Sequence, residues 1–224
     1  MEERYKRNIP AITEEEQAVL STKTVAVTGC GGLGGHIIES LARIGIGRLL
    51  LIDCDEFSET NLNRQLFSKE SNLGKRKVEE AKFRVHEINS NIDVEIIDQK
   101  IDSSNAEDIL KNADIVIDAL DNVDGRFAVC DACEKLGLYF IHGAIGGWRA
   151  QVSTIAPGSK GLDKIYPRDM ASDPPSVLSF TPFLCASIQV SEAIKVLLGQ
   201  DDTLEGKMLV ADLQSNMFII IDLI

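Results

Sequence analysis

The sequence predicts an α/β fold, with a mostly parallel sheet flanked by helices and antiparallel strands at the C-terminal end. Three stretches carry this prediction. Residues 23–55 have the pattern of a strand, a glycine-rich turn, a helix and a second strand, which is a βαβ unit. Residues 113–119 are an apolar run bounded by acids, typical of a buried parallel strand. Residues 208–212 and 217–222 are apolar runs joined by turn residues, which favours a terminal hairpin.

The first half of the chain alternates helical and strand patterns. Residues 1–22 are charged and predict a solvated arm with a helix near 13–20, where Thr13 and Glu16 have the spacing of a capping box. Apolar spacing predicts helices at 33–44 and 78–89 and a strand at 93–98. The polar residues 56–65 predict a loop, and a short helix is expected at 105–111.

The second half continues the alternation. We expect a helix at 127–136, strands at 139–142 and 151–155, and a turn at 143–147. Residues 157–176 are rich in Gly, Pro, Ser and charge, which predicts a mobile loop. A long helix is expected at 180–198, ending at Gly199. Because no repeat or linker divides the sequence, we interpret residues 1–224 as one domain.

Composition narrows the class of protein. The chain has 224 residues, 44% of them hydrophobic, and a formal net charge of −12, which argues against a broad nucleic-acid or membrane-surface role. No apolar run has the length of a membrane-spanning helix, and residues 1–7 lack the apolar core of a signal peptide. We therefore expect a cytoplasmic protein.

The five cysteines do not form a metal or disulfide pattern. Cys30, Cys54, Cys130, Cys133 and Cys185 are an odd number, mostly within apolar segments, as expected for reduced packing thiols. Cys130 and Cys133 form a CxxC within a predicted helix, but the chain offers no second pair to complete four zinc ligands. We predict no zinc site.

The glycine-rich turn predicts a Rossmann-like nucleotide site. The sequence Gly29-Cys30-Gly31-Gly32-Leu33-Gly34 follows one strand and opens a helix. Glycines let the backbone approach a phosphate closely, and the first N–H groups of the helix favour an anion. Asp53, at the end of the second strand, can accept hydrogen bonds from ribose hydroxyls.

Polar residues follow the strand ends, where open α/β sheets bind ligands. Besides the glycine loop, this edge should gather Asp53, Asp55, Asn61, Asn63, Arg64, Gln65, Lys77, Asp118, Asp121 and Asn122. The two cations can neutralise phosphate charge in a transition state, and an aspartate can hold Mg²⁺ that bridges phosphate oxygens. The pattern therefore indicates chemistry on a nucleoside triphosphate.

Six motifs lie in order along the chain. They are Arg4–Asn8 (RYxRQ, with Asn8 for Gln), Gly29–Gly34 (GxGGLG), 53–65 (DxD, then NLxRQ), Gly74–Glu79 (GxxKxE), Asp118–Arg126 (DxxDNxxxR) and 192–195 (EAIK). Together they resemble the ThiF/MoeB/HesA family, the bacterial relatives of ubiquitin-activating enzymes. The likeness runs from about Arg4 to the C-terminus.

The resemblance implies a mixed sheet, a homodimer and ATP-dependent adenylation of the C-terminal Gly-Gly of a ThiS/MoaD-like sulfur carrier, with release of pyrophosphate. It implies that Asp53 binds the ribose and that Asn61, Arg64 and Lys77 hold the triphosphate. It further implies that Asp121 carries magnesium. Arg7 would reach from the partner subunit into the ATP site, in contrast to a merely solvated arm.

The chain also departs from the family pattern. Many members carry two zinc-binding CxxC pairs, and both are absent, so the chain resembles a short, zinc-free member. Many also carry a cysteine in the crossover loop that links covalently to the carrier. That position falls near Ser172, and no cysteine lies between Cys133 and Cys185. We therefore predict adenylation without a carrier thioester at this loop, with sulfur delivered by another protein.

Three alternatives remain at this point. One is activation of a carboxyl group on a modified tRNA, which the net charge of −12 disfavours. Another is a NAD-dependent oxidoreductase, which gives Arg64, Lys77 and Asp121 no role. The third is a nucleotide-binding scaffold without catalysis, which does not need these three residues. The sequence leaves open the identity of the carrier and its pathway, thiamine, molybdopterin or another.

Overall fold

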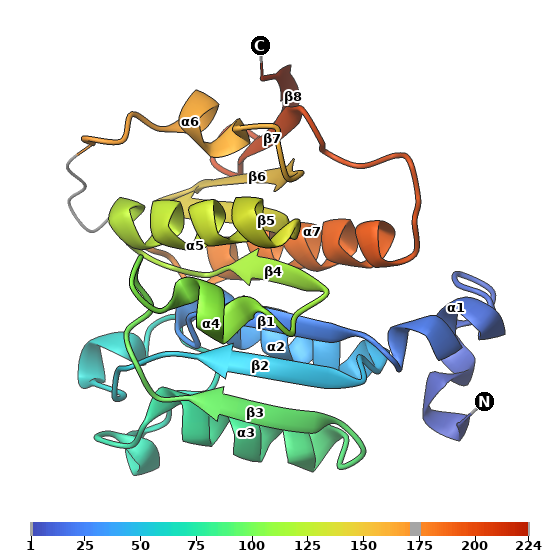
Figure 1. The fold of residues 1–224 in the computed structure, drawn as a ribbon. Helices are drawn as coiled ribbons and strands as arrows, with labels where there is room; N and C mark the ends of the chain where they lie inside the picture. The colour runs from blue at the N-terminus through green and yellow to red at the C-terminus, as the bar shows by residue number, and fades with distance from the viewer. Residues whose placement is uncertain (1, 171–175, 224) are drawn as a thin grey trace.

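The fold is an eight-stranded mixed sheet with helices on both faces (Figure 1). The computed structural model describes residues 2–170 and 176–223. The strand order is β3-β2-β1-β4-β5-β6-β7-β8. The first five strands are parallel, and β6, β7 and β8 are antiparallel to their neighbours. The strands are β1 Thr24–Thr28, β2 Arg48–Ile52, β3 Asp93–Ile97, β4 Ile115–Asp118, β5 Tyr139–Gly146, β6 Arg149–Ile155, β7 Lys207–Asp212 and β8 Met217–Asp222. The predicted fold class is confirmed.

Two hydrophobic cores cover the two faces of the sheet. One is built with the helices α2 (Gly32–Ile44), α3 (Lys77–Ile88) and α7 (Phe180–Leu197). The other includes the helices α4 (Ala106–Leu110), α5 (Val123–Leu136) and α6 (Gly161–Ile165). Along β1, Val25 and Val27 face the first core and Ala26 faces the second, as the two-residue period of a strand requires. The remaining helices are α1 (Glu14–Leu20) and the 3₁₀ helices η1 (Glu3–Asn8), η2 (Glu59–Asn61) and η3 (Glu70–Asn72).

Two predicted boundaries were wrong near the end of the parallel strands. Helix α5 begins at Val123 rather than at 127, because the Asn122 side chain accepts a hydrogen bond from the Gly125 N–H and caps the first turn. Strand β5 continues to Gly146 rather than ending at 142, and it pairs with β6 as far as Arg149. The predicted turn at 143–147 is therefore reduced to residues 147 and 148. Gly143 pairs with Val152 of β6, and its missing side chain leaves room for the Gln189 side chain, which packs where a Cβ would lie.

The N-terminal arm is docked on the domain and is not simply solvated. Tyr5 is buried: its ring lies against Gly45 at the C-terminal end of α2, and its hydroxyl accepts a hydrogen bond from Asn89 Nδ2 at 2.7 Å. The sequence did not predict this docking, because the residues around Tyr5 are charged and have the composition of a solvated segment. The predicted capping box of Thr13 and Glu16 is confirmed at the start of α1.

The segment 157–176 contains the short helix α6, which the sequence did not predict. Leu162 anchors this helix in the second core. Ser172, near which the family resemblance would place a carrier-linking cysteine, lies outside the described residues. By length and composition alone, helix α7 is long and apolar enough to cross a membrane, although polar and charged residues interrupt its sequence so that it is not a continuous apolar run. Half of its length is buried, and it packs against α2, β5 and β6.

Candidate nucleotide-binding site

The candidate site lies where the direction of strand addition reverses. The chain proceeds from β1 outward to β2 and β3, then returns to place β4 on the other side of β1. A crevice forms outside the carboxyl ends of such strands. The glycine loop follows β1 at this point. Gly29 has φ +109°, and a Cβ there would lie 2.6 Å from the Ala119 carbonyl oxygen, so only glycine fits this approach to the β4 end.

Asp53 fastens the glycine loop to the end of β2. Its two carboxylate oxygens accept hydrogen bonds from the Cys30 N–H at 2.7 Å and the Asp55 N–H at 2.8 Å. Burial raises the pKa of Asp53, while the positive charge of Lys77 and the two N–H groups act in the opposite direction. The structure thus gives Asp53 a role in shaping the loop, in addition to the ribose contact that remains a prediction.

Lys77 brings a positive charge to the same edge. It opens α3 and is only 6% exposed, and its Nζ lies 2.8 Å from Asp55 Oδ2. The Lys77 N–H also donates to the Asp55 carbonyl oxygen, which fixes the start of α3 beside the end of β2. Asp55 itself is largely exposed. Lys77 is therefore held in place by one carboxylate that an incoming phosphate can replace.

Arg64, Gln65 and Asn61 come from the loop after β2. The Arg64 side chain lies beside Gly32, and its Nη1 donates to the Thr60 carbonyl and the Asn63 side chain. The Gln65 amide packs against Gly31, and its buried Oε1 has no hydrogen-bond partner among the described residues. Asn61 is buried, and its Oδ1 caps η2 by accepting from the Ser58 N–H. The unpartnered Gln65 oxygen beside the glycine loop fits a ligand that donates a hydrogen bond.

Asp121 and Asn122 follow β4 on the opposite side of the glycine loop. Asp121 is exposed, and within residues 2–170 and 176–223 its carboxylate contacts only the Asn122 amide, at 3.2 Å. Asn122 also caps α5 through its Oδ1. The structure therefore brings the loop, Asp53, Asp55, Asn61, Arg64, Gln65, Lys77, Asp121 and Asn122 to one edge of the sheet.

The carboxylates at this edge of the sheet are the candidate ligands for a magnesium ion. Oxygens of Asp53 and Asp55 lie within 4.8 Å of each other and of the Cys54 sulfur. However, Asp53 already accepts two backbone N–H groups and Asp55 pairs with Lys77, so this cluster does not fit a metal. Asp121 fits better, because it is an exposed hard-oxygen donor just after the carboxyl end of β4.

The structure does not bring Arg7 to the site of its own chain. Arg7 lies on η1, which packs by Tyr5 against the C-terminal end of α2, whereas the glycine loop precedes the N-terminal end (Figure 1). The 13 residues of α2 separate the two ends by about 20 Å at 1.5 Å per residue. Any action of Arg7 at a nucleotide site therefore requires another copy of the chain.

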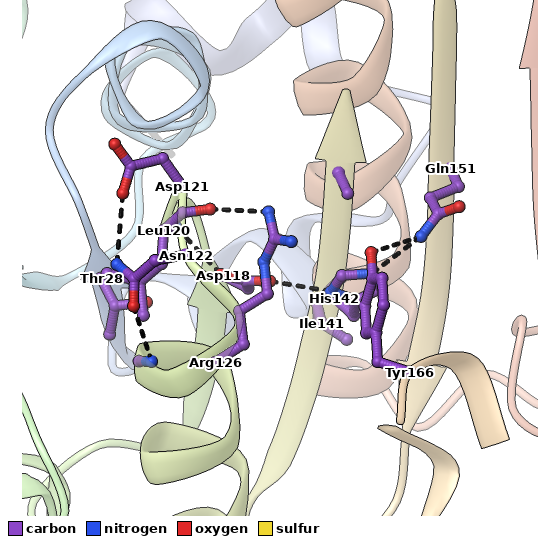
Figure 2. A network of polar contacts seen from close by, with 12 residues as sticks. Thr28, Asp118, Leu120, Asp121, Asn122, Arg126, Ile141, His142, Gln151 and Tyr166 are labelled. Atoms are coloured by element: carbon purple, nitrogen blue, oxygen red, sulfur yellow. Dashed lines mark hydrogen bonds and ion pairs between the residues drawn. The ribbon is translucent and has the colours of Figure 1, made fainter. Parts of the chain in front are cut away.

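A buried polar network next to Asp121 was only partly visible in the sequence. It consists of Asp118, Arg126, His142, Gln151 and Tyr166 (Figure 2). Asp118 and Arg126 belong to the DxxDNxxxR motif, whereas His142 falls within the strand predicted at 139–142 and Tyr166 within the loop predicted at 157–176. Their partners come from four different elements, so no local pattern could reveal the network.

Cys30 and Cys54 lie at the candidate site, and the other three cysteines lie on the helices α5 and α7. Cys130 and Cys133 lie on α5, and burial raises the pKa of the Cys130 thiol to about 12 and that of Cys133 further still. Such thiols are protonated at neutral pH and are poor nucleophiles and metal ligands.

Comparison with known proteins agrees with this geometry. The model of the ThiF family matches residues 5–223. The SAMP-activating enzyme E1 of Haloferax volcanii is 32% identical over 96% of this chain and 83% of its own length. A probable molybdopterin-synthase adenylyltransferase of Porphyra purpurea is 34% identical over 92% of this chain, which spans 56% of that protein. The crystal structure of Escherichia coli MccB shares the fold, with a TM-score of 0.86 and 23% identity over 98% of this chain and 69% of MccB. The chain belongs to the ThiF family.

Proposed function

We propose that this protein is an ATP-dependent adenylyltransferase that activates the C-terminal carboxylate of a small ubiquitin-like carrier protein. The observation that carries the proposal is the convergence of Lys77, Arg64 and an exposed Asp121 around the glycine loop. A dinucleotide site needs the loop but has no use for two cations and a free carboxylate beside it. Relatives named as adenylyltransferases or as a SAMP-activating enzyme support this class of reaction.

The reaction follows from where the charges lie. The N-terminal end of α2, which has no side-chain cap, offers backbone N–H groups to a phosphate. The carrier carboxylate attacks the α-phosphate, its oxygen forms the new P–O bond, and pyrophosphate departs with the electrons of the broken bond. Lys77 and Arg64 neutralise the negative charge that develops on the phosphate oxygens. Bound Mg²⁺, held by Asp121, would neutralise further charge on the triphosphate.

The product is a carrier acyl-adenylate. In this proposal the enzyme stops there and a separate protein delivers sulfur, because the chain has no cysteine between Cys133 and Cys185. The buried thiols of Cys133 and Cys185, whose pKa values burial raises, are unsuited to forming a carrier thioester.

The active form in this proposal is a homodimer. Helix α2, about 20 Å long, separates the end against which the arm packs from the glycine loop of the same chain, so in this proposal Arg7 acts in the site of a partner. Apolar side chains around the site are available for that contact: Leu62, Leu66 and Phe183 are all more than one third exposed.

The test is ATP–pyrophosphate exchange with Mg²⁺, with and without a ubiquitin-like carrier that ends in Gly-Gly. We expect exchange that depends on the carrier, and no exchange with a carrier truncated by its last two glycines. ATP binding without exchange, using several such carriers, would instead favour a tRNA carboxyl substrate or a scaffold.

A further inference from the structure

The buried polar network beside the site connects two segments that are far apart in the sequence. Asp118 and His142 are fully buried, and His142 Nδ1 lies 2.8 Å from Asp118 Oδ2. Arg126 Nε lies 3.2 Å from the same Asp118 oxygen, within ion-pair distance although not aligned for a hydrogen bond. Tyr166, which directly follows α6, brings its hydroxyl to 3.2 Å from His142 Nε2 (Figure 2).

The donors and acceptors form an ordered chain. Because Nδ1 of His142 faces a carboxylate, it carries the proton, and Nε2 is then the acceptor. The Tyr166 hydroxyl therefore donates to Nε2, and it accepts in turn from Gln151 Nε2 at 2.6 Å. The Arg126 guanidinium lies 5.7 Å from the centre of the Tyr166 ring, which adds a direct contact between Arg126 and Tyr166.

The other end of the network holds the backbone that precedes Asp121. Asp118 Oδ1 accepts a hydrogen bond from the Leu120 N–H at 3.0 Å. Arg126 Nη2 donates to the Leu120 carbonyl oxygen at 2.7 Å. Both backbone polar groups of Leu120, the residue before Asp121, are thus fixed from inside the protein, while among the described residues the Asp121 side chain is hydrogen-bonded only to its neighbour Asn122.

A buried polar network of this kind stabilises the core less efficiently than apolar side chains do. A buried ion pair gains little stability over apolar residues of the same volume, because both charges lose their hydration. Its advantage is fixed geometry, since each member is satisfied in only one arrangement. The fixed geometry here ends at the turn that carries the proposed magnesium ligand.

We propose that Asp118, Arg126 and His142 are positioning residues that set the Asp121 turn for the metal–nucleotide complex, and that Tyr166 connects this turn to the 157–170 segment. The inference rests on the proposed function, because it assigns Asp121 to the metal. It adds residues that act through the backbone and do not touch the nucleotide.

The test measures metal binding directly, without relying on catalysis. Mn²⁺, in place of Mg²⁺, is titrated into the full-length protein with α,β-methylene ATP, and free Mn²⁺ is followed by electron paramagnetic resonance. Arg126→Lys keeps the charge but loses the planar fork that reaches both Asp118 and Leu120. We expect it to weaken Mn²⁺ binding about tenfold, the usual effect of losing an outer-shell partner.

Tyr166→Phe removes only the hydroxyl, and we expect a smaller loss of Mn²⁺ affinity, about threefold, because it acts through His142. Tyr139→Phe is the matched control: Tyr139 lies at the amino end of the same strand as His142 and outside the network, and the Mn²⁺ affinity of this variant should equal that of the wild type. If Arg126→Lys does not fold, Tyr166→Phe decides the question.

The outcomes distinguish a positioning role of the network from a purely structural one, and they test the proposed function separately. Variants that melt at lower temperature but bind Mn²⁺ like the wild type would show that the network is only structural, and the proposal would fall. A wild-type protein that binds Mn²⁺ with the nucleotide but exchanges no pyrophosphate would defeat the proposed function and leave the comparison of variants valid. A wild type that binds no Mn²⁺ with the nucleotide would overturn both.

Discussion

Replacing Lys77 by methionine removes one positive charge and leaves most of the packing in place. The Lys77 side chain is nearly buried, so the methionine chain occupies the volume of its stem. Its partner Asp55 is 61% exposed, and such a pair contributes only about 0–1 kcal/mol to stability. The free energy of unfolding should therefore change by no more than about 1 kcal/mol, which shifts the melting temperature by roughly 2–4 °C for a chain of this size.

The same change should be severe for the reaction. A unit charge about 4 Å from a phosphate oxygen contributes about 4 kcal/mol at the effective dielectric constant of a partly buried site. Removing one preorganised donor of this kind costs about 10²–10³ in kcat. We therefore expect carrier-dependent pyrophosphate exchange to fall by about that factor in Lys77→Met.

The assay is exchange at saturating ATP and carrier, with thermal unfolding measured on the same samples. Lys82→Met, on the same helix but away from the strand ends, is the control and should exchange at the wild-type rate. Exchange in Lys77→Met within about threefold of the wild type, a difference below 1 kcal/mol, would remove Lys77 from the mechanism. A large loss of melting temperature would instead show that the charge is structural.

Three further outcomes follow from the geometry. Asp53→Asn leaves one of two backbone N–H groups without an acceptor, so the free energy of unfolding in urea should fall by about 1–3 kcal/mol and ATP binding measured by calorimetry should weaken. Unchanged values would mean that the glycine loop does not depend on this carboxylate. Mixing Arg7→Ala with Lys77→Met subunits should restore about a quarter of wild-type exchange. Half of the dimers are then mixed, and each mixed dimer has one complete site, in which one subunit supplies Lys77 and the other supplies Arg7. No recovery would place Arg7 outside the partner's site. Burial lowers the pKa of His142, although the charge of Asp118 acts in the opposite direction, so the unfolded chain binds more protons than the folded one and the free energy of unfolding should fall as the pH drops below about 6.5. In urea unfolding, His142→Asn should reduce this dependence of stability on pH. An unaltered dependence would contradict a lowered pKa for His142.

The sequence predicted the nucleotide-binding edge because its signals are local. Gly29 and Asp53 lie next to the strands that position them, and the conformational requirement of the turn can be satisfied only by glycine. Lys77 opens a helix whose apolar spacing is clear. Once the strands are placed, the topology brings these residues together without further information.

Other features depend on contacts that no local pattern encodes. His142 is a single histidine in an apolar strand, and its partner Asp118 lies 24 residues earlier on the neighbouring strand. Tyr5 is buried by Gly45 and Asn89, although its neighbours are charged. Strand β5 extends past residue 142 through its antiparallel pairing with β6, and glycine at 143 leaves room for the Gln189 side chain of α7, which is a tertiary contact. Burial and long-range pairing therefore decided the points where the sequence prediction was incomplete.

The most direct test of the central claim is detection of the acyl-adenylate itself. The protein is incubated with ATP, Mg²⁺, pyrophosphatase and a carrier ending in Gly-Gly, and the intact mass of the carrier is measured. We predict a carrier that is heavier by one AMP group at its C-terminus, with Asp121→Ala protein giving none. A carrier of unchanged mass, together with ATP consumption that is independent of any carrier, would contradict the assignment.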